Sequence, residues 1–373
     1  MITPQQACDR CAQLIDLAVR HGADAADAVT AGSSSESVTV RLGALEDVER
    51  SEGEEIGLRV FVGSRSASIS TSDFSDSALA EMAERAVAMA KLAPEDPYAG
   101  LAPEEMLASG PFADFDLADP AEPSPTRLRE RALEVEDSAR SVHGVTNSAG
   151  ASAGFGRSVS ALVTSHGFSA GYEATSHSLS ASMIAGEGDA MQRDYEYRVA
   201  RHLEDVPAAT DIGREAGQRA VARLNPARLS SGAMPVVFDP RVSGGLIGHL
   251  IGAMSGMAIA RRSSFLLDRL DDPVFQSAIS IHENPHLRRG VRSRPFDGEG
   301  LATQPRDLVK DGKVTGWLLN AASARQLGLP LTGHAARGGS GAPGISASNI
   351  HLAAGAHSVE DLIADIDHGV LVN

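Results

Sequence analysis

Polar residues alternate with Val and Leu from residue 37 to residue 42, and this alternation constrains the fold of the 373-residue chain most. A period of two is typical of a half-buried β-strand, because successive side chains point to opposite faces of the sheet. Residues 56–62 and 66–72 flank a short Gly-Ser turn and predict two further strands. We therefore expect the first part of the chain to form a sheet.

The middle of the chain predicts more strands, and these have unusually small side chains. Residues 145–153, 158–165 and 178–184 are rich in Ser, Gly and Ala. Small side chains on both faces weaken a strand, since they bury little surface against their neighbours. This sheet is therefore expected to depend on packing against a helix or a partner.

Helices are predicted on either side of these strands. Thr3 and Gln6 form a capping box near the N-terminus, with Pro4 at the first helical position. Strands that are followed by helices in this order indicate an α+β fold with mixed or antiparallel sheets and packed helices. The other expected helices cover residues 75–91, 126–141 and 208–224, and two more begin after Asp239 and at Ser358.

Length and local composition divide the chain into two or three units. A chain of 373 residues exceeds one ordinary compact domain. Residues 94–125 are rich in Pro, Ala and acidic residues, which is typical of an exposed linker. The expected units are an N-terminal α/β unit (1–95), a linker (96–125), a middle α+β unit (126–226) and a C-terminal unit (227–373).

Charge and cysteine content exclude several classes of protein. The chain has 33 basic and 49 acidic residues, and its formal net charge of -16 repels both nucleic acid and anionic membranes. Cys8 and Cys11, its two cysteines, cannot form a disulfide framework or a four-ligand zinc site, and they fit a reducing compartment. Because no leader or membrane-spanning run is present, the cytoplasm is the expected location.

Residues 282–286 spell His-Glu-Asn-Pro-His and match the HExxH motif of zinc peptidases. That motif requires a helix that places both imidazoles on one face. Pro285 removes a backbone donor and disfavours the helical conformation at Asn284. We therefore expect a loop without a metal at this place.

Gly339, Gly341 and Gly344 match the GxGxxG pattern of dinucleotide-binding proteins. The pattern requires a following helix, whereas residues 345–352 alternate like a strand. A flexible loop is the expected structure. It is also a candidate border of a peptide cleft, because backbone approaches closely where side chains are absent.

Residues 244–249 read Gly-Gly-Leu-Ile-Gly-His and lie in the helix that is expected after Asp239. A catalytic zinc ion normally takes three protein ligands, and this segment contains one imidazole. Taken alone, the segment indicates a packed or partly exposed His249 without a ligand role.

Distinctive blocks of sequence lie along the chain. One of them covers residues 293–300, and its first part, Ser293-Arg294-Pro295-Phe296-Asp297, is fairly specific. Together they resemble the PmbA/TldD family and, within it, the PmbA (TldE) branch. The resemblance covers nearly the whole chain. The other blocks are residues 57–63, 70–73, 165–169, 189–195, 239–249, 316–320 and 332–350.

The resemblance has implications for residues 244–249. In this family, TldD carries an HExxxH helix and a later cysteine for the metal. It pairs with TldE to form a heterodimeric peptidase that cuts unfolded or extended peptides in an enclosed cavity. Gly244 and Gly245 stand where the first histidine and the glutamate would be, and no cysteine follows Cys11. Only His249 matches, as a vestigial candidate. No cofactor is expected on this chain, and zinc is expected in a TldD-like partner.

The expected function is therefore that of a non-catalytic subunit, because water is not activated without a metal and a general base. Such a subunit would form one wall of the peptide cleft, bind unfolded peptide and hold the TldD-like partner. One alternative is a regulatory protein-binding module, suggested by the family's old label as a modulator of DNA gyrase. Another is an autonomous metallopeptidase that uses His249, His282 and His286. The family pattern continues past Asn373, which raises the further alternative of a partial chain.

Overall fold

The computed structural model describes residues 1–226, 229–339 and 341–373. Its largest element is a six-stranded antiparallel sheet with the strand order β3-β2-β1-β4-β5-β6. Because β1 pairs with β4, the strands of the expected N-terminal and middle units share one sheet. The strands are β1 (Ala25–Arg41), β2 (Ala44–Val62), β3 (Arg65–Thr71), β4 (Val145–Thr164), β5 (Ser169–Ala185) and β6 (Gln192–Ala200).

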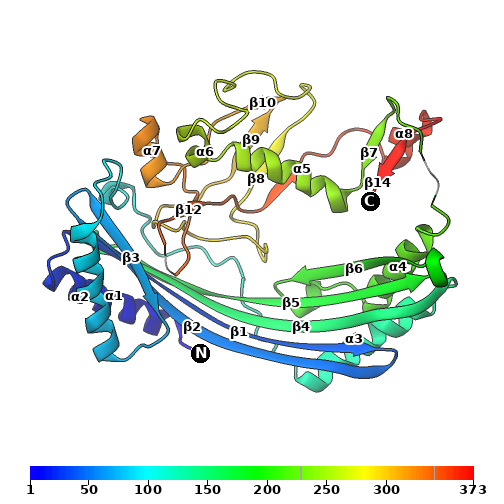
Figure 1. Ribbon diagram of the computed structural model, residues 1–373, viewed down its shortest axis with the longest axis horizontal. Coiled ribbons are helices and arrows are strands. Elements are labelled where there is room, and N and C mark those ends of the chain that lie inside the picture. Colours follow the sequence, from blue (N-terminus) through cyan, green and yellow to red (C-terminus); the bar gives the residue numbers. More distant parts are fainter. Residues whose placement is uncertain (227–228, 340) are drawn as a thin grey trace.

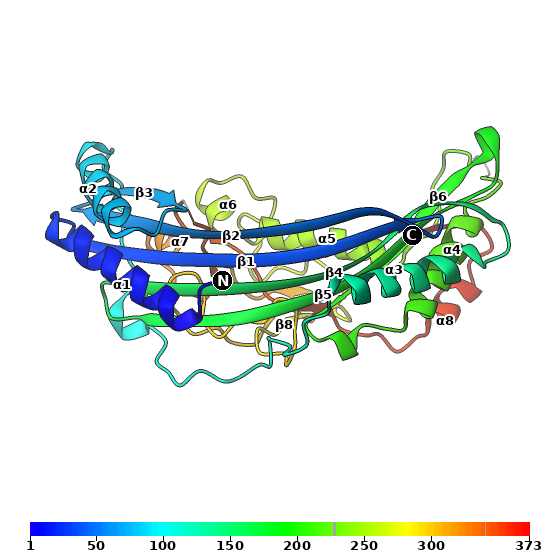
Figure 2. The same ribbon diagram turned by 90° about the horizontal axis from the view of Figure 1, so that it is seen from below.

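Four helices cover one face of this sheet (Figures 1 and 2). Helices α1 (Pro4–Arg20) and α2 (Asp76–Leu92) pack at one end, around Leu58 and Leu79. At the other end, α3 (Pro125–Arg140) and α4 (Ala209–Ala222) pack on the small side chains of β4 and β5. The helix packing that was expected for these strands is therefore present.

The positions of the strands were predicted better than their lengths. Residues 145–153 and 158–165, expected as two strands, belong to the single strand β4. Likewise, β1 begins at Ala25, well before the alternating residues 37–42. Glycine and serine interrupt the sequence pattern but not the strand, because β4 has hydrogen-bonded neighbours on both sides.

The C-terminal part lies over the concave side of the sheet, opposite α1 and α3 (Figures 1 and 2). Its core contains Met254, Ile281 and Leu318. Strands β10, β9, β8 and β13 form a sheet, β11 pairs with β12, and β14 pairs in parallel with β7. The elements are β7 (Val236–Phe238), α5 (Pro240–Ala253), α6 (Gly256–Ala260), β8 (Ile281–Glu283), β9 (Arg306–Lys310), β10 (Lys313–Val314), α7 (Ala321–Leu327), β11 (Ala335–Ala336), β12 (Gly344–Ile345), β13 (Ile350–Leu352), α8 (Val359–Ala364) and β14 (Val370–Val372).

Part of the segment 94–125 packs against both parts of the molecule, so the expectation of an exposed linker is wrong for that part. Leu101 and Leu117 are buried. The guanidinium of Arg325 in α7 donates hydrogen bonds to backbone carbonyls of the segment, including that of Tyr98 at 2.8 Å. Apolar side chains and bound carbonyls thus hold a segment whose composition alone indicates exposure.

The helices and antiparallel sheets confirm the α+β fold class. Within the described ranges, no helix combines the length and the apolar character that crossing a membrane requires. The first two residues of the expected C-terminal unit, 227 and 228, lie outside the described part of the chain.

Candidate functional site

Helix α5 begins where the sequence predicts. The Asp239 side chain accepts a hydrogen bond from the backbone N–H of Arg241 at 2.8 Å, and Pro240 occupies the first turn. On the inner side of the helix, Leu250 and Ala253 are buried in the C-terminal core. The helix that carries Gly244, Gly245 and His249 is therefore intact.

The aligned metal positions lie on the exposed side of α5. Gly244, Gly245 and His249 are all exposed, and a Cβ atom added at either glycine would meet open space. Steric crowding therefore does not explain why glycine occupies these positions. Since glycine has no ligand atom and no carboxylate base, His249 is the one side chain of the three that could coordinate a metal.

His249 borders an apolar cleft of about 560 Å³, with Leu246, Ile247, Phe265 and Phe275 among its lining residues. Within the described ranges, no three His, Cys, Asp or Glu side chains are grouped so that they could hold a metal ion. The three aligned positions do not fit a catalytic zinc ion, which takes three protein ligands.

The HExxH match forms a strand and a turn, so the expected loop is only partly right. His282 and Glu283 end β8, and they point to opposite faces of its sheet because side chains alternate along a strand. Glu283 is buried and contacts His334 at 2.7 Å. Hydrogen bonds from His334 and from the Ser348 backbone lower the pKa of Glu283 to about 2, although desolvation opposes them.

The two histidines of the match also have separate partners. His282 Nδ1 lies 2.5 Å from an Asp307 carboxylate oxygen, and His286 Nε2 lies 3.1 Å from the Thr303 hydroxyl. His249 is on α5, at the apolar cleft. The structure therefore does not bring together the three histidines of an autonomous peptidase.

The glycine-rich loop connects β11 to β12 and reaches the large sheet. A Cβ atom added at Gly57 of β2 would overlap the backbone carbonyl of Gly339. Gly341 has open space around its Cβ position, and Gly344 begins β12. Ser340, which is part of the predicted loop, lies outside the described residues. One end of the loop therefore packs against the sheet.

Replacing Gly57 with valine is expected to displace this loop. The strand β2 is hydrogen-bonded to β1 and β3 on its two sides at this residue, so it cannot move away from the loop. Overpacking of this kind costs about 1–3 kcal/mol of unfolding free energy. Urea unfolding and hydrogen exchange in residues 335–345 measure the two effects. Gly53→Val is the matched control, since a Cβ at Gly53 of the same strand meets open space. Equal losses in both variants would contradict the contact.

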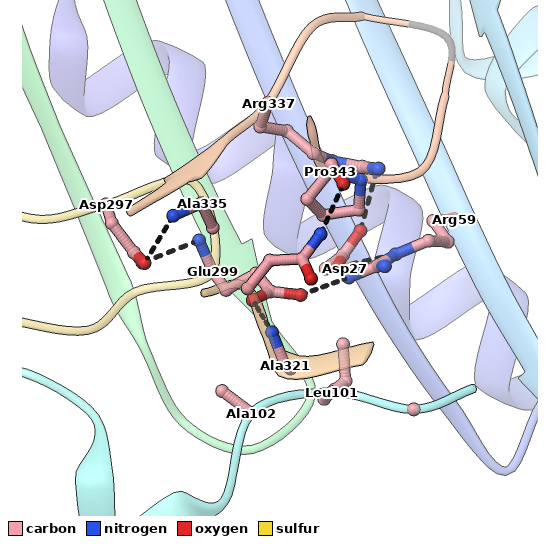
Figure 3. Close-up of polar contacts among 12 residues, drawn as sticks. Asp27, Arg59, Leu101, Ala102, Asp297, Glu299, Ala321, Ala335, Arg337 and Pro343 are labelled. Carbon is pink, nitrogen blue, oxygen red and sulfur yellow. Dashed lines mark hydrogen bonds and ion pairs between the residues drawn. The ribbon is translucent and has the colours of Figure 1, made fainter. Parts of the chain in front are cut away.

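Beside this loop, a cluster of buried charges joins the C-terminal part to the sheet (Figure 3). Asp27 of β1 is 1% exposed and lies between the guanidinium groups of Arg59 and Arg337. Its carboxylate accepts hydrogen bonds from Arg59 Nε at 2.9 Å and from Arg337 at 2.7 Å. Because Asp27 and Arg59 belong to the sheet and Arg337 follows β11, the cluster ties two distant segments together.

Glu299 completes the cluster from the loop between β8 and β9. One of its oxygens lies 3.8 Å from Arg59, and the other accepts a hydrogen bond from the Ala321 backbone at the start of α7. Burial raises the pKa of Glu299 to about 7, and the charge of Arg59 only partly offsets this rise. The protonation of one carboxyl group at this junction therefore changes near neutral pH.

Family comparisons agree with this architecture along most of the chain. Models described as PmbA/TldA metallopeptidase domain 1, central domain and C-terminal domain match residues 26–90, 118–224 and 231–373. Metalloprotease PmbA of Escherichia coli O157:H7 is 39% identical over 313 residues, which cover 84% of this chain and 69% of that protein. The chain belongs to the PmbA/TldD family.

Solved structures show the same PmbA/TldD fold. A Bacteroides thetaiotaomicron protein, described as a candidate modulator of DNA gyrase, is 26% identical. Its TM-score is 0.90, over 100% of this chain and 82% of that one. TldE from Thermococcus kodakarensis is 22% identical with a TM-score of 0.85, over 97% and 82% of the two chains. At that identity the likeness to TldE shows the fold alone.

Sequence reasoning did not single out the charge cluster, although two signals for it were present. Arg59 interrupts the otherwise apolar predicted strand 56–62. Residues 293–300, which form one of the PmbA/TldD blocks, contain Asp297 and Glu299. A charged residue inside an apolar strand requires a buried partner, but the sequence does not show that Asp27 and Arg337 supply it.

Proposed function

We propose that this chain is a non-catalytic, TldE/PmbA-like subunit of a heterodimeric metallopeptidase that acts on unfolded or extended peptides in the cytoplasm. The observation that supports this most is the exposed side of α5, where Gly244 and Gly245 replace a ligand and a base in an intact helix. In this proposal the zinc ion and the general base belong to a TldD-like partner.

The contribution of this chain is then structural. The large sheet and its helices form a rigid support, and the charge cluster fixes the C-terminal part on it. The glycine-rich loop is proposed to border the peptide cleft through Gly341 and Gly344. Gly339 contacts the large sheet and is therefore not proposed to border the cleft.

The test is to assay the cleavage of an unstructured peptide by this chain, by a TldD-like partner and by their mixture. Cleavage is expected in the mixture only, because a metal-bound water and a base are both needed. Metal analysis of the separated subunits is expected to find zinc in the partner. Cleavage by this chain alone, or stoichiometric zinc on it, would overturn the proposal.

The variant His249→Ala sharpens this test. If His249 is vestigial, the mixture with this variant keeps the wild-type cleavage rate. A large loss of cleavage with normal assembly would assign His249 a role at the substrate.

A second candidate function is that of a regulatory protein-binding module. It is supported by the description of the Bacteroides thetaiotaomicron protein as a candidate modulator of DNA gyrase. Stable assembly with the TldD-like partner without any cleavage would favour this function over the first.

A further inference from the structure

Hydroxyl groups line the face of the large sheet that points away from α1–α4. Val38 and Val40 of β1 point toward the helices, so the residues between them point to the opposite side. The pairing of β1 with β4 and of β4 with β5 places the following residues on that side: Ser33, Ser35, Ser37, Thr39, Ser152, Ser158, Ser160, Ser176, Ser178, Ser180 and Ser182. We call these residues the hydroxyl face.

Where the C-terminal part covers the same side of the sheet, the side chains are apolar or belong to the buried charge cluster of Asp27 and Arg59. There, Val29 and Leu162 are buried against Phe296. Further along the strands, Ser33, Ser35 and Ser178 are exposed. The side chains thus change from buried apolar and paired charged groups to exposed hydroxyl groups where the cover ends. Serine is not among the residues that favour strands, so the stability of the strands does not explain the change.

Aromatic side chains border the hydroxyl face at one side. Tyr195 and Tyr197 of the edge strand β6 lie opposite Ser182 and Ser180 and are 45% and 55% exposed. Their rings stack at a centroid distance of 6.2 Å. The guanidinium of Arg241 lies over the Tyr195 ring at 4.4 Å, which leaves Tyr197 as the open ring.

Carboxylates border the hydroxyl face at the other side. Asp47 and Glu49 of β2 lie opposite Thr39 and Ser37, and both are exposed. Glu55 continues this row toward the C-terminal part. Arg193 of β6 is an exposed cation on the same face of the sheet. It lies opposite Ile184, near the start of β6. The β2 border is therefore negatively charged.

We propose that the hydroxyl face binds an extended, basic stretch of polypeptide, with Asp47, Glu49 and Tyr197 setting the preference. A serine hydroxyl both donates and accepts hydrogen bonds, so a row of them can bind the backbone of any extended sequence. The carboxylates attract Lys and Arg side chains, and an exposed tyrosine ring favours a cation over its face. The polypeptide nature of the ligand rests on the proposed function.

Binding of labelled peptides, followed by fluorescence anisotropy, tests this inference directly on the whole chain. The probes are unstructured peptides of about 10 residues. At about 3.3 Å per residue, an extended peptide of this length is longer than the roughly 19 Å from β2 to β6. Three versions carry lysine, serine or glutamate at the same alternate positions. The lysine version is expected to bind most tightly, and added salt is expected to weaken it.

Two variants locate the binding. Asp47→Asn with Glu49→Gln is expected to weaken the lysine peptide about five- to tenfold at low ionic strength, as two exposed ion pairs are lost. Tyr197→Ser is expected to weaken the lysine peptide more than the serine and glutamate peptides, because the ring favours a cation. The matched control is Glu81→Gln with Glu84→Gln, which removes the same charge from exposed positions of α2 behind the sheet.

Several results would overturn the inference. These are equal affinities for the lysine and glutamate peptides, equal effects of the control and of the Asp47 and Glu49 variant, or no saturable binding. The proposed function is tested separately by cleavage in the mixture with a TldD-like partner. Charge-dependent binding without cleavage would support this inference and reject the proposed function.

Discussion

Replacing Asp27 with alanine is expected to lower the free energy of unfolding by about 3–5 kcal/mol, which is the usual cost of breaking a buried ion pair. Asp27 is the carboxylate that Arg59 and Arg337 share, and all three side chains are buried. Its removal leaves two guanidinium groups near one another without their common partner. Urea unfolding, with midpoint and slope fitted together, measures the loss.

The matched control for this variant is Asp76→Ala. Asp76 forms an ion pair with Arg10 at 3.0 Å, but both side chains are largely exposed. Exposed pairs of this kind contribute about 0–1 kcal/mol. A loss at Asp27 no larger than that at Asp76 would show that the cluster does not hold the C-terminal part to the sheet.

Replacing Glu299 with glutamine is expected to change how stability depends on pH. Burial raises the pKa of this carboxyl group from 4.5 to about 7, so the folded state binds its proton more tightly than the unfolded state does. The stability from this group is complete below pH 4.5 and is lost as pH rises through about 7. The rise corresponds to about 3 kcal/mol.

Glutamine cannot ionise, so Glu299→Gln removes this loss and keeps an oxygen that accepts from Ala321. The unfolding free energy of the variant, relative to the wild type, is therefore expected to increase by about 3 kcal/mol between pH 4 and pH 8. Urea unfolding at several pH values measures it. Glu130→Gln, at an exposed position of α3, is the control. Parallel pH profiles of the Glu299 variant and the wild type would contradict the prediction.

Local sequence signals predicted much of the fold. The capping box of Thr3 and Gln6 forms as predicted, and so does the start of α5 at Asp239. The errors concern segments whose structure depends on distant parts of the chain. The segment 94–125 has the composition of a linker, but Arg325 and apolar neighbours bury part of it. Composition does not reveal such contacts.

The candidate site was predictable only in part. Residues 244–249 show directly that two positions lack side chains, and Pro285 correctly indicates that the HExxH match is not helical. The charge cluster depends on pairing between Asp27 and Arg337, which are distant in sequence. From the sequence, the serines of the hydroxyl face were predicted only as parts of weak strands. Their position on one face follows from the register between strands, which the fold determines.

The pairing of β1 with β4 also has a consequence for the order of folding. Asp27 pairs with Thr164, so β1 cannot complete its hydrogen bonds during synthesis until β4 has left the ribosome. Until then, one edge of a long strand is open, and such edges promote association with other chains. A fragment that ends before β4 is therefore expected to aggregate. Residues 26–90 are therefore a recognisable unit of homology that is not expected to fold independently.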